Sequence, residues 1–244
     1  MDIKEASELS QQEERKHWWI KTRFLYIDKA FDYLENQRDI NVIEFGCGTA
    51  QNLWYLQEES QYKNNILSML GIDPELPKDF KVDWNKAQNI ELSNDLNRPE
   101  ENKADIGMAM DVLEHIEDEN MALQGWNKSL KSNGLMFVTV PAFQALWSYH
   151  DEFLDHKRRY TKTQLTKVLN ENGFEAVKVT YAFSFIFPLV YLIRKLSKGS
   201  ESTQDLALPP MIINGILYFC GKVENIFGGF PFFGTSVIGI YRKI

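Results

Sequence analysis

Cysteine is scarce in this sequence of 244 residues: only Cys47 and Cys220 are present, far apart along the chain. Two distant cysteines form no disulfide framework, so we interpret both as free thiols in a reducing compartment. The sequence also lacks a run of about 18 apolar residues, the length that spans a bilayer. Because residues 1–8 contain no apolar stretch typical of a signal peptide, we expect a cytoplasmic protein.

Positively charged residues are also fewer than negatively charged ones. Lysine and arginine number 27 against 34 aspartates and glutamates, which gives a net charge of −7. This balance argues against general binding to nucleic acid. No cluster of ligands has the spacing of a zinc site, so we expect no metal. Apolar residues make up 44% of the chain and include 16 phenylalanines, enough for the core of one domain with additions.

A glycine turn stands between a short apolar run, residues 42–45, and a helical pattern that starts at Gln51. Gly46 and Gly48 form this turn, which predicts close contact between backbone and a ligand at the positive end of the helix. A nucleotide-like cofactor is the expected ligand. A dinucleotide fingerprint would have its third glycine at position 51, where Gln51 stands instead.

The stretch resembles the cofactor loop of class I S-adenosylmethionine (SAM) dependent methyltransferases, which read hydrophobic-Asp/Glu-x-Gly-x-Gly-x-Gly. Glu44, Gly46 and Gly48 match this pattern, and Ala50 replaces the third glycine. The resemblance extends in order over most of residues 40–182. It implies an α/β fold, a Rossmann-like, seven-stranded, mostly parallel sheet with helices on both faces, and SAM as the cofactor.

Two acidic positions follow predicted strands in that resemblance. Asp73 and Pro74 end an apolar strand at 66–72, where a carboxylate accepts hydrogen bonds from ribose hydroxyls; a surface aspartate opening a turn is the alternative. The resemblance implies that Asp95 and Leu96 contact the adenine, although an Asn-Asp-Leu-Asn segment alone is usually a turn.

The strand at 104–110 leads into Asp111-Val-Leu-Glu-His115, which matches the family's next motif at every position. The resemblance implies that Asp111 and Val112 lie beside the cofactor and that His115 faces the reaction space, unless this histidine only caps local structure. Residues 10–36 form a helical pattern. That helix either packs on the sheet or forms a lid in which Arg23 lies near the methionine carboxylate.

Ligands of parallel sheets bind beyond the carboxyl ends of the strands, and each of these motifs follows a strand. The loop at 141–163 follows the fifth strand and is therefore expected on the acceptor side. Its pattern, Leu-Trp-Ser-x-His-Asp and then His-x-Arg-Arg-Tyr-Thr, resembles a bacterial subgroup of these methyltransferases. The alternative is a solvated, charged helix end before the capping box of Thr161 and Gln164.

Roles in this loop follow from side-chain chemistry. His150, oriented by Asp151 or another carboxylate, is a candidate general base for a hydroxyl acceptor. Arginine and lysine suit an anionic acceptor. The full set of acceptor-side candidates is His150, His115 and Tyr160 for catalysis and Asp151, His156, Arg158 and Arg159 for acceptor binding.

The last third of the chain predicts a helix at 161–172, a strand at 174–181 and two apolar helices near 182–193 and 210–227. Twelve apolar residues are too few to span a bilayer. This helical pair could pack on the domain, form a homodimer through residues 183–227, or contact a membrane or a lipid-linked acceptor. By the resemblance, residues 236–243 form a final antiparallel strand.

We therefore expect a lid at 1–38, a SAM-binding core at 39–182, a helical insertion at 183–235 and a last core strand at 236–244. The expected function is transfer of a methyl group from SAM to a small anionic or lipid-linked acceptor at oxygen. One alternative is a SAM-binding sensor without catalysis that assembles with a partner. Another is an NAD(P)-dependent oxidoreductase, against which Gln51 and Asp95 both argue.

Overall fold

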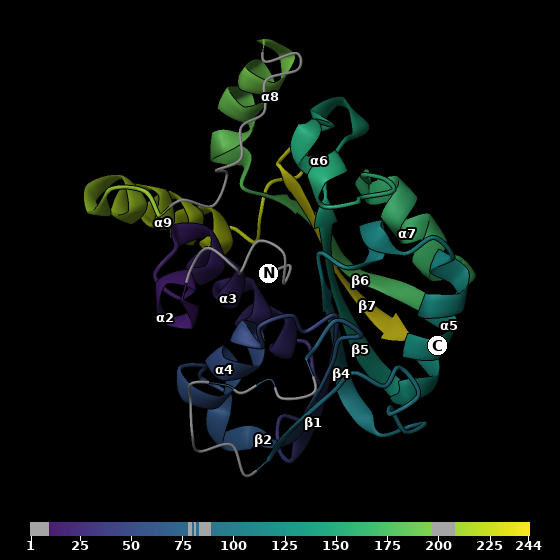
Figure 1. Cartoon of the computed structure of the whole chain (residues 1–244). Coiled ribbons are helices and arrows are strands. Elements are labelled where there is room, and N and C mark those ends of the chain that lie inside the picture. Colours follow the sequence, from purple (N-terminus) through teal and green to yellow (C-terminus); the bar gives the residue numbers. More distant parts are fainter. Residues whose placement is uncertain (1–9, 78–79, 81, 83–88, 197–207) are drawn as a thin grey trace.

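The computed structural model describes residues 10–77, 80, 82, 89–196 and 208–244. Its centre is one seven-stranded sheet with the strand order β3-β2-β1-β4-β5-β7-β6 (Figure 1). Strands β1 to β5 run parallel, and β7 lies antiparallel between β5 and β6. The predicted fold class is confirmed. The strands are β1 (Ile40–Phe45), β2 (Ile66–Ile72), β3 (Ile90–Ser93), β4 (Ala104–Met110), β5 (Leu130–Pro141), β6 (Phe174–Ala182) and β7 (Ser236–Lys243).

Helices cover both faces of this sheet, as a parallel sheet of nearly continuous apolar strands requires. On one face, α3 and α4 pack with Phe31, Leu53 and Phe137 in one buried cluster. On the other, α5 and α7 contribute Trp126 and Leu165 to a second cluster. The helices are α2 (Gln11–Glu14), α3 (Trp18–Phe31), α4 (Gln51–Glu58), α5 (Glu119–Ser129), α6 (Tyr149–Phe153), α7 (Lys162–Glu171), α8 (Phe187–Leu196) and α9 (Met211–Ile226).

Two helix boundaries differ from the sequence prediction. The single helix expected over residues 10–36 is wrong, because His17 has an extended backbone and its side chain accepts a hydrogen bond from the Trp19 amide, which starts α3 afresh. The pair Asn133-Gly134 in the sequence predicts a helix stop, but helix α5 already ends at Ser129. Asn133 has a φ of 63° and lies in the irregular first part of β5, where the register with β4 shifts.

Helix α9 packs on α3 with its polar side. The Asn214 side chain accepts a hydrogen bond from the Trp18 amide at 2.9 Å. Glu224 accepts from the Tyr26 hydroxyl at 3.1 Å and from the Phe183 amide at 2.6 Å. Leu217 and Tyr218 of α9 also pack against the buried cluster, while the opposite side of the helix is apolar and exposed. The exposed large apolar residues of α9 are Met211, Ile212, Ile213, Ile216, Phe219, Val223 and Ile226.

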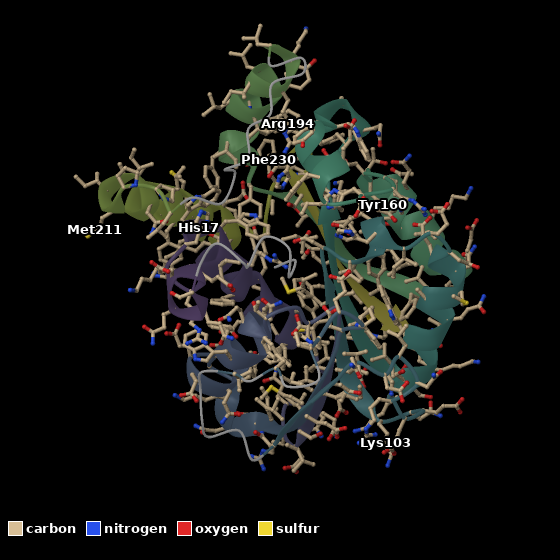
Figure 2. The ribbon with its side chains drawn as sticks, in the orientation of Figure 1. His17, Lys103, Tyr160, Arg194, Met211 and Phe230 are labelled. Carbon is tan, nitrogen blue, oxygen red and sulfur yellow. The ribbon has the colours of Figure 1, made fainter. Side chains whose placement is uncertain are left out.

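Among the described residues, none of the helices is long and apolar enough to cross a membrane. Figure 2 shows Met211 at the outer end of α9, pointing away from the sheet. Helix α8 projects in a different direction from the same side of the molecule (Figure 1). Both helices therefore add apolar surface outside the core of the fold.

Candidate cofactor and acceptor site

A cavity of about 1650 Å³ lies at the carboxyl ends of the parallel strands, and α3 and α8 contribute further walls. Ligand sites usually measure about 300–1,000 Å³, so this cavity has room for a cofactor and a second molecule. It is lined by seven of the predicted cofactor residues, namely Arg23, Gly46, Asp73, Pro74, Leu96, Asp111 and Val112.

The turn after β1 is shaped for a close ligand. Gly46 has a φ of 67°, and a Cβ atom there would come within 2.4 Å of a Val112 methyl group. The Gly46 amide donates to the carbonyl of Ile72 at 2.7 Å, which ties the turn to β2. Ala50, at the third glycine position, also adopts left-handed backbone with a φ of 60°. The turn thus keeps the glycine-like path at a cost of about 1–2 kcal/mol.

Asp73 is held by two backbone amides at the cavity wall. Its Oδ2 atom accepts from the Gly48 amide at 2.8 Å, and its Oδ1 atom accepts from the Glu75 amide at 2.9 Å. Each carboxylate oxygen has a second lone pair that can accept a bond from a ribose hydroxyl. Gly48 itself does not line the cavity, so its contribution is to fix Asp73.

Glu44 and Asp95 stand apart from the cavity, contrary to the direct contacts expected of them. Glu44 is fully buried, where it accepts a hydrogen bond from Asn52, and burial raises its pKa to about 7. Asp95 is exposed and accepts from the Asn97 amide at 2.9 Å, the turn that the alternative interpretation predicted. Leu96 and Asn97 line the wall in its place.

Arg23 crosses from α3 to the cavity. Its Nη1 atom lies 3.0 Å from Oδ2 of Asp111, and its guanidinium lies over the Trp19 ring at 4.4 Å. Arg23 is buried, yet none of its three side-chain nitrogens makes a hydrogen bond within the described residues. Buried donors without acceptors are costly, so this site suits an added carboxylate such as the methionine end of SAM.

On the acceptor side, Asp151 is the centre of a buried network. Arg159 donates to both of its oxygens, at 2.6 Å and 3.0 Å. His156 Nδ1 lies 2.9 Å from Oδ1, and the Ser148 amide donates to Oδ2. Burial alone would raise the pKa of Asp151, but the bonds from His156 and Arg159 together with the arginine charge hold it well below its ordinary value.

This network corrects several acceptor-side predictions. Asp151 contacts His156, and it is fully buried away from the cavity wall. Arg159 lines the cavity and also donates to the Ala142 carbonyl at 3.1 Å, so three of its five N–H donors are used within the loop. Burial of Asp151 with Arg159 therefore serves the structure of the loop.

Arg158 and Tyr160 likewise lie away from the cavity wall. Arg158 forms an ion pair with Glu119 and donates to the Glu117 carbonyl at 3.2 Å. The Tyr160 hydroxyl donates to Glu119 at 2.5 Å, and burial raises the tyrosine pKa far above its ordinary value. A buried phenol of this kind is a poor catalytic acid or base, so the prediction for Tyr160 fails on position.

Four predicted residues of the acceptor side do line the cavity: His115, His150, His156 and Arg159. Lys157 joins them there, and so does Glu114, a buried residue that the sequence predictions passed over. Ligand atoms of Glu114, His115 and His156 lie within 4.8 Å of one another, an arrangement that spacing along the chain did not reveal. The signal for Glu114 was its place in the Asp111–His115 motif.

Comparison with known proteins agrees with the fold described above. Residues 19–179 match the family model described as a methyltransferase domain. A SAM-dependent methyltransferase from Archaeoglobus fulgidus has a TM-score of 0.55 at 18% identity, covering 94% of this chain and 97% of that one. No curated protein matched the sequence.

Two further solved structures share the fold. Geranyl diphosphate C-methyltransferase from Streptomyces coelicolor has a TM-score of 0.54 at 11% identity, covering 91% of this chain and 76% of that one. Phosphoethanolamine N-methyltransferase 2 from Haemonchus contortus was solved with SAM. It has a TM-score of 0.54 at 14% identity, and the match covers 91% of this chain and 52% of that one. From the matched residues, the shared fold and the glycine turn at its cavity, this chain belongs to the methyltransferase domain family, whose cofactor is SAM.

Proposed function

We propose that this protein transfers a methyl group from SAM to an oxygen atom of an anionic, lipid-linked acceptor. The observation that carries the proposal is the single cavity of about 1650 Å³, which joins the cofactor motifs to histidines, a lysine and an apolar wall of α8. Transfer needs little beyond placing two reactants in line, so a cavity that holds both is the central requirement.

At the cofactor end, Asp73 would accept from the ribose hydroxyls, Arg23 would bind the methionine carboxylate, and Gly46 would leave room for the adenosyl group. Bound SAM supplies the electrophilic methyl group, and the acceptor oxygen forms the new bond as the sulfur–carbon bond breaks. The electron pair of that bond stays on sulfur. His150, half-buried at the cavity wall, would take the proton of the acceptor hydroxyl.

An anionic acceptor is supported by Lys157, which lines the acceptor end of the cavity. An ammonium group attracts phosphate or carboxylate as a compact positive charge. Two structural neighbours are named for acceptors that carry phosphate, geranyl diphosphate and phosphoethanolamine. Their identity to this chain is low, so they support the chemical class and no individual acceptor.

The lipid-linked part of the proposal rests on α8. Ile186, just before this helix, and Val190 and Ile193 within it line the cavity, while Leu189 and Leu192 on the same helix are more than half exposed. Apolar surface therefore runs from the exterior of the protein into the acceptor end. A lipid chain could follow this path with its apolar carbons out of water.

The outer faces of α8 and α9 are then proposed to rest on a bilayer. Ile216 and Phe219 of α9 are 57% and 66% exposed although its polar side chains face α3. Lys222 on α9 and Lys195 on α8 are exposed and suit an anionic lipid surface. A second copy of the chain would cover the path along α8, whereas a bilayer would supply the acceptor through it.

Calorimetric titration with SAM tests the cofactor end. Asp73→Ala is expected to weaken SAM binding about 10- to 100-fold, the effect of losing hydrogen bonds to a charged group. Asp95→Ala is the matched control, because that carboxylate lies outside the cavity. Wild-type protein that binds no SAM, or equal affinity for all three proteins, would refute this assignment.

Catalysis is tested with methyl-labelled SAM and a bacterial lipid extract. Label that moves into the lipid fraction supports the proposal. Cofactor that binds and is never consumed, with the lipid extract or with a total cell extract, supports the alternative of a SAM sensor. Label that appears only in water-soluble metabolites would remove the lipid-linked acceptor and leave the methyltransferase.

Membrane contact is tested by flotation with vesicles of phosphatidylcholine and phosphatidylglycerol. Wild type is expected to float, and the double variant Ile216→Asp, Phe219→Asp is expected to stay in the dense fraction. Leu67→Asp is the control, since Leu67 is equally exposed but lies at the start of β2. Wild type that does not float and elutes as a dimer, with the double variant monomeric, would establish the homodimer instead.

A further inference from the structure

We infer that Glu114, His115 and His156 form a binding site for a divalent metal ion at the acceptor end of the cavity. Glu114 and His115 belong to the short helical turn Leu113–His115 that follows β4, and His156 follows α6. The fold therefore brings together residues that are distant in the sequence. The role given to the ion below rests on the proposed function; the binding site itself does not.

The geometry of the three side chains fits an ion after a small closure. Their ligand atoms lie within 4.8 Å of one another, and the two imidazole rings meet edge to face with centroids 4.6 Å apart. Ligands at about 2.1 Å from a tetrahedral metal are roughly 3.4 Å apart. Side-chain rotations that bring the ligand atoms closer together by about 1 Å would complete the site.

Glu114 supplies a second, independent reason. Its side chain is fully buried, and neither carboxylate oxygen has a hydrogen-bond partner within the described part of the chain. The nearby cations Arg23 and Arg159 are engaged by Asp111 and Asp151. A buried carboxylate without partners is costly, and a bound cation would supply the missing interaction.

His156 is oriented as metal-binding histidines usually are. Its Nδ1 atom lies 2.9 Å from Asp151, which accepts from Arg159 and from the Ser148 amide and is therefore ionised. An ionised carboxylate accepts the Nδ1 proton, and this leaves the lone pair on Nε2 as a ligand. The buried Asp151–Arg159 pair would then hold the His156 ring in one orientation.

One carboxylate and two imidazoles favour ions of borderline softness, such as Fe²⁺ or Zn²⁺, over Mg²⁺ and Ca²⁺, which prefer oxygen ligands. Mn²⁺ is harder and binds such sites more weakly, but it serves as a spectroscopic probe of the site. All three residues line the cavity beside Lys157. A cation at this place would attract an anionic oxygen of the acceptor and lower the pKa of a hydroxyl beside it. Methylation at oxygen would then need only a weak base.

The experiment titrates Mn²⁺ into chelator-treated full-length protein and follows the free ion by electron paramagnetic resonance. Wild type is expected to bind one equivalent, and Glu114→Gln and His156→Asn are expected to weaken binding at least tenfold. Asp151→Asn keeps all three ligands but removes the carboxylate that orients His156, so it should weaken Mn²⁺ binding by about 10- to 100-fold. His150→Asn is the control, because that histidine shares the cavity and lies outside the cluster.

SAM affinity is measured on the same samples, which separates the two proposals. SAM binding without Mn²⁺ binding by wild type overturns the metal site and leaves the proposed function intact. Mn²⁺ binding without SAM binding or methyl transfer overturns the proposed function and leaves the metal site intact. Equal Mn²⁺ affinity in wild type and Glu114→Gln also overturns the site, and His115→Asn repeats the test should Glu114→Gln fail to fold.

Discussion

Glu44 lies fully buried behind the glycine turn, and its ionisation should make the stability of the fold depend on pH. One oxygen accepts a hydrogen bond from Asn52 at 2.5 Å, and the other has no partner within the described residues. Burial raises the pKa of this carboxyl from 4.5 to about 7; the charge of Arg23 opposes this shift and that of Asp73 adds to it.

The sign follows from comparing the folded and unfolded states. A folded-state pKa above the unfolded value means that the folded protein binds the proton more tightly, so stability is full below pH 4.5 and falls as the pH rises through about 7. Each pKa unit corresponds to about 1.36 kcal/mol. Between roughly pH 5.5 and pH 8 the loss from Glu44 is therefore about 2 kcal/mol of unfolding free energy.

Glu44→Gln isolates this effect, because glutamine has the shape of the protonated side chain and does not titrate. Urea unfolding of both proteins, followed by circular dichroism at several pH values, gives the difference in unfolding free energy. The variant is expected to gain about 2 kcal/mol on wild type between about pH 5.5 and pH 8. A difference that stays constant over this range would show that Glu44 does not titrate there and would refute the argument from burial.

Two further predictions concern the same cavity. Gly46→Ala should weaken SAM binding at least tenfold by calorimetry, since the new Cβ meets Val112 at 2.4 Å on left-handed backbone. Gly215→Ala, with open space around its Cβ and outside the cavity lining, is the control and should bind SAM normally. Arg159→Ala should lower the unfolding free energy by about 3 kcal/mol, the low end for breaking a buried pair, because the carboxylate of Asp151 keeps His156 and the more distant Arg194 at 3.8 Å. A loss below about 1 kcal/mol in urea unfolding would place that ion pair among the weak surface pairs.

The sheet and the order of its motifs could be predicted because local signals and the fold agree. The apolar runs that become β1, β4 and β5 are each followed by a polar motif, and parallel strands bring those motifs to one edge. The break between α2 and α3 was not predictable from periodicity, because it depends on the His17 side chain capping the Trp19 amide.

The sequence predicted that the acceptor loop lies at the acceptor end, but it did not predict which side chains pair with one another. His150, His156, Lys157 and Arg159 line the cavity, but which cation meets Asp151 depends on how the chain turns after α6. Arg159 and His156 reach that carboxylate, and His150 stays at the cavity wall. Glu114 was passed over because its burial beside two histidines is a product of tertiary structure.

The polar seam between α9 and α3 has a consequence for regulation. Gly221 of α9 packs so closely on Thr22 of α3 that a Cβ would come within 2.5 Å, and the next residue, Arg23, reaches Asp111 at the cavity. A shift of α9 caused by binding at its outer face is therefore expected to move the helix that supplies the arginine. By thermodynamic reciprocity, an attachment that shifts α9 changes SAM affinity by the same factor by which SAM changes the attachment.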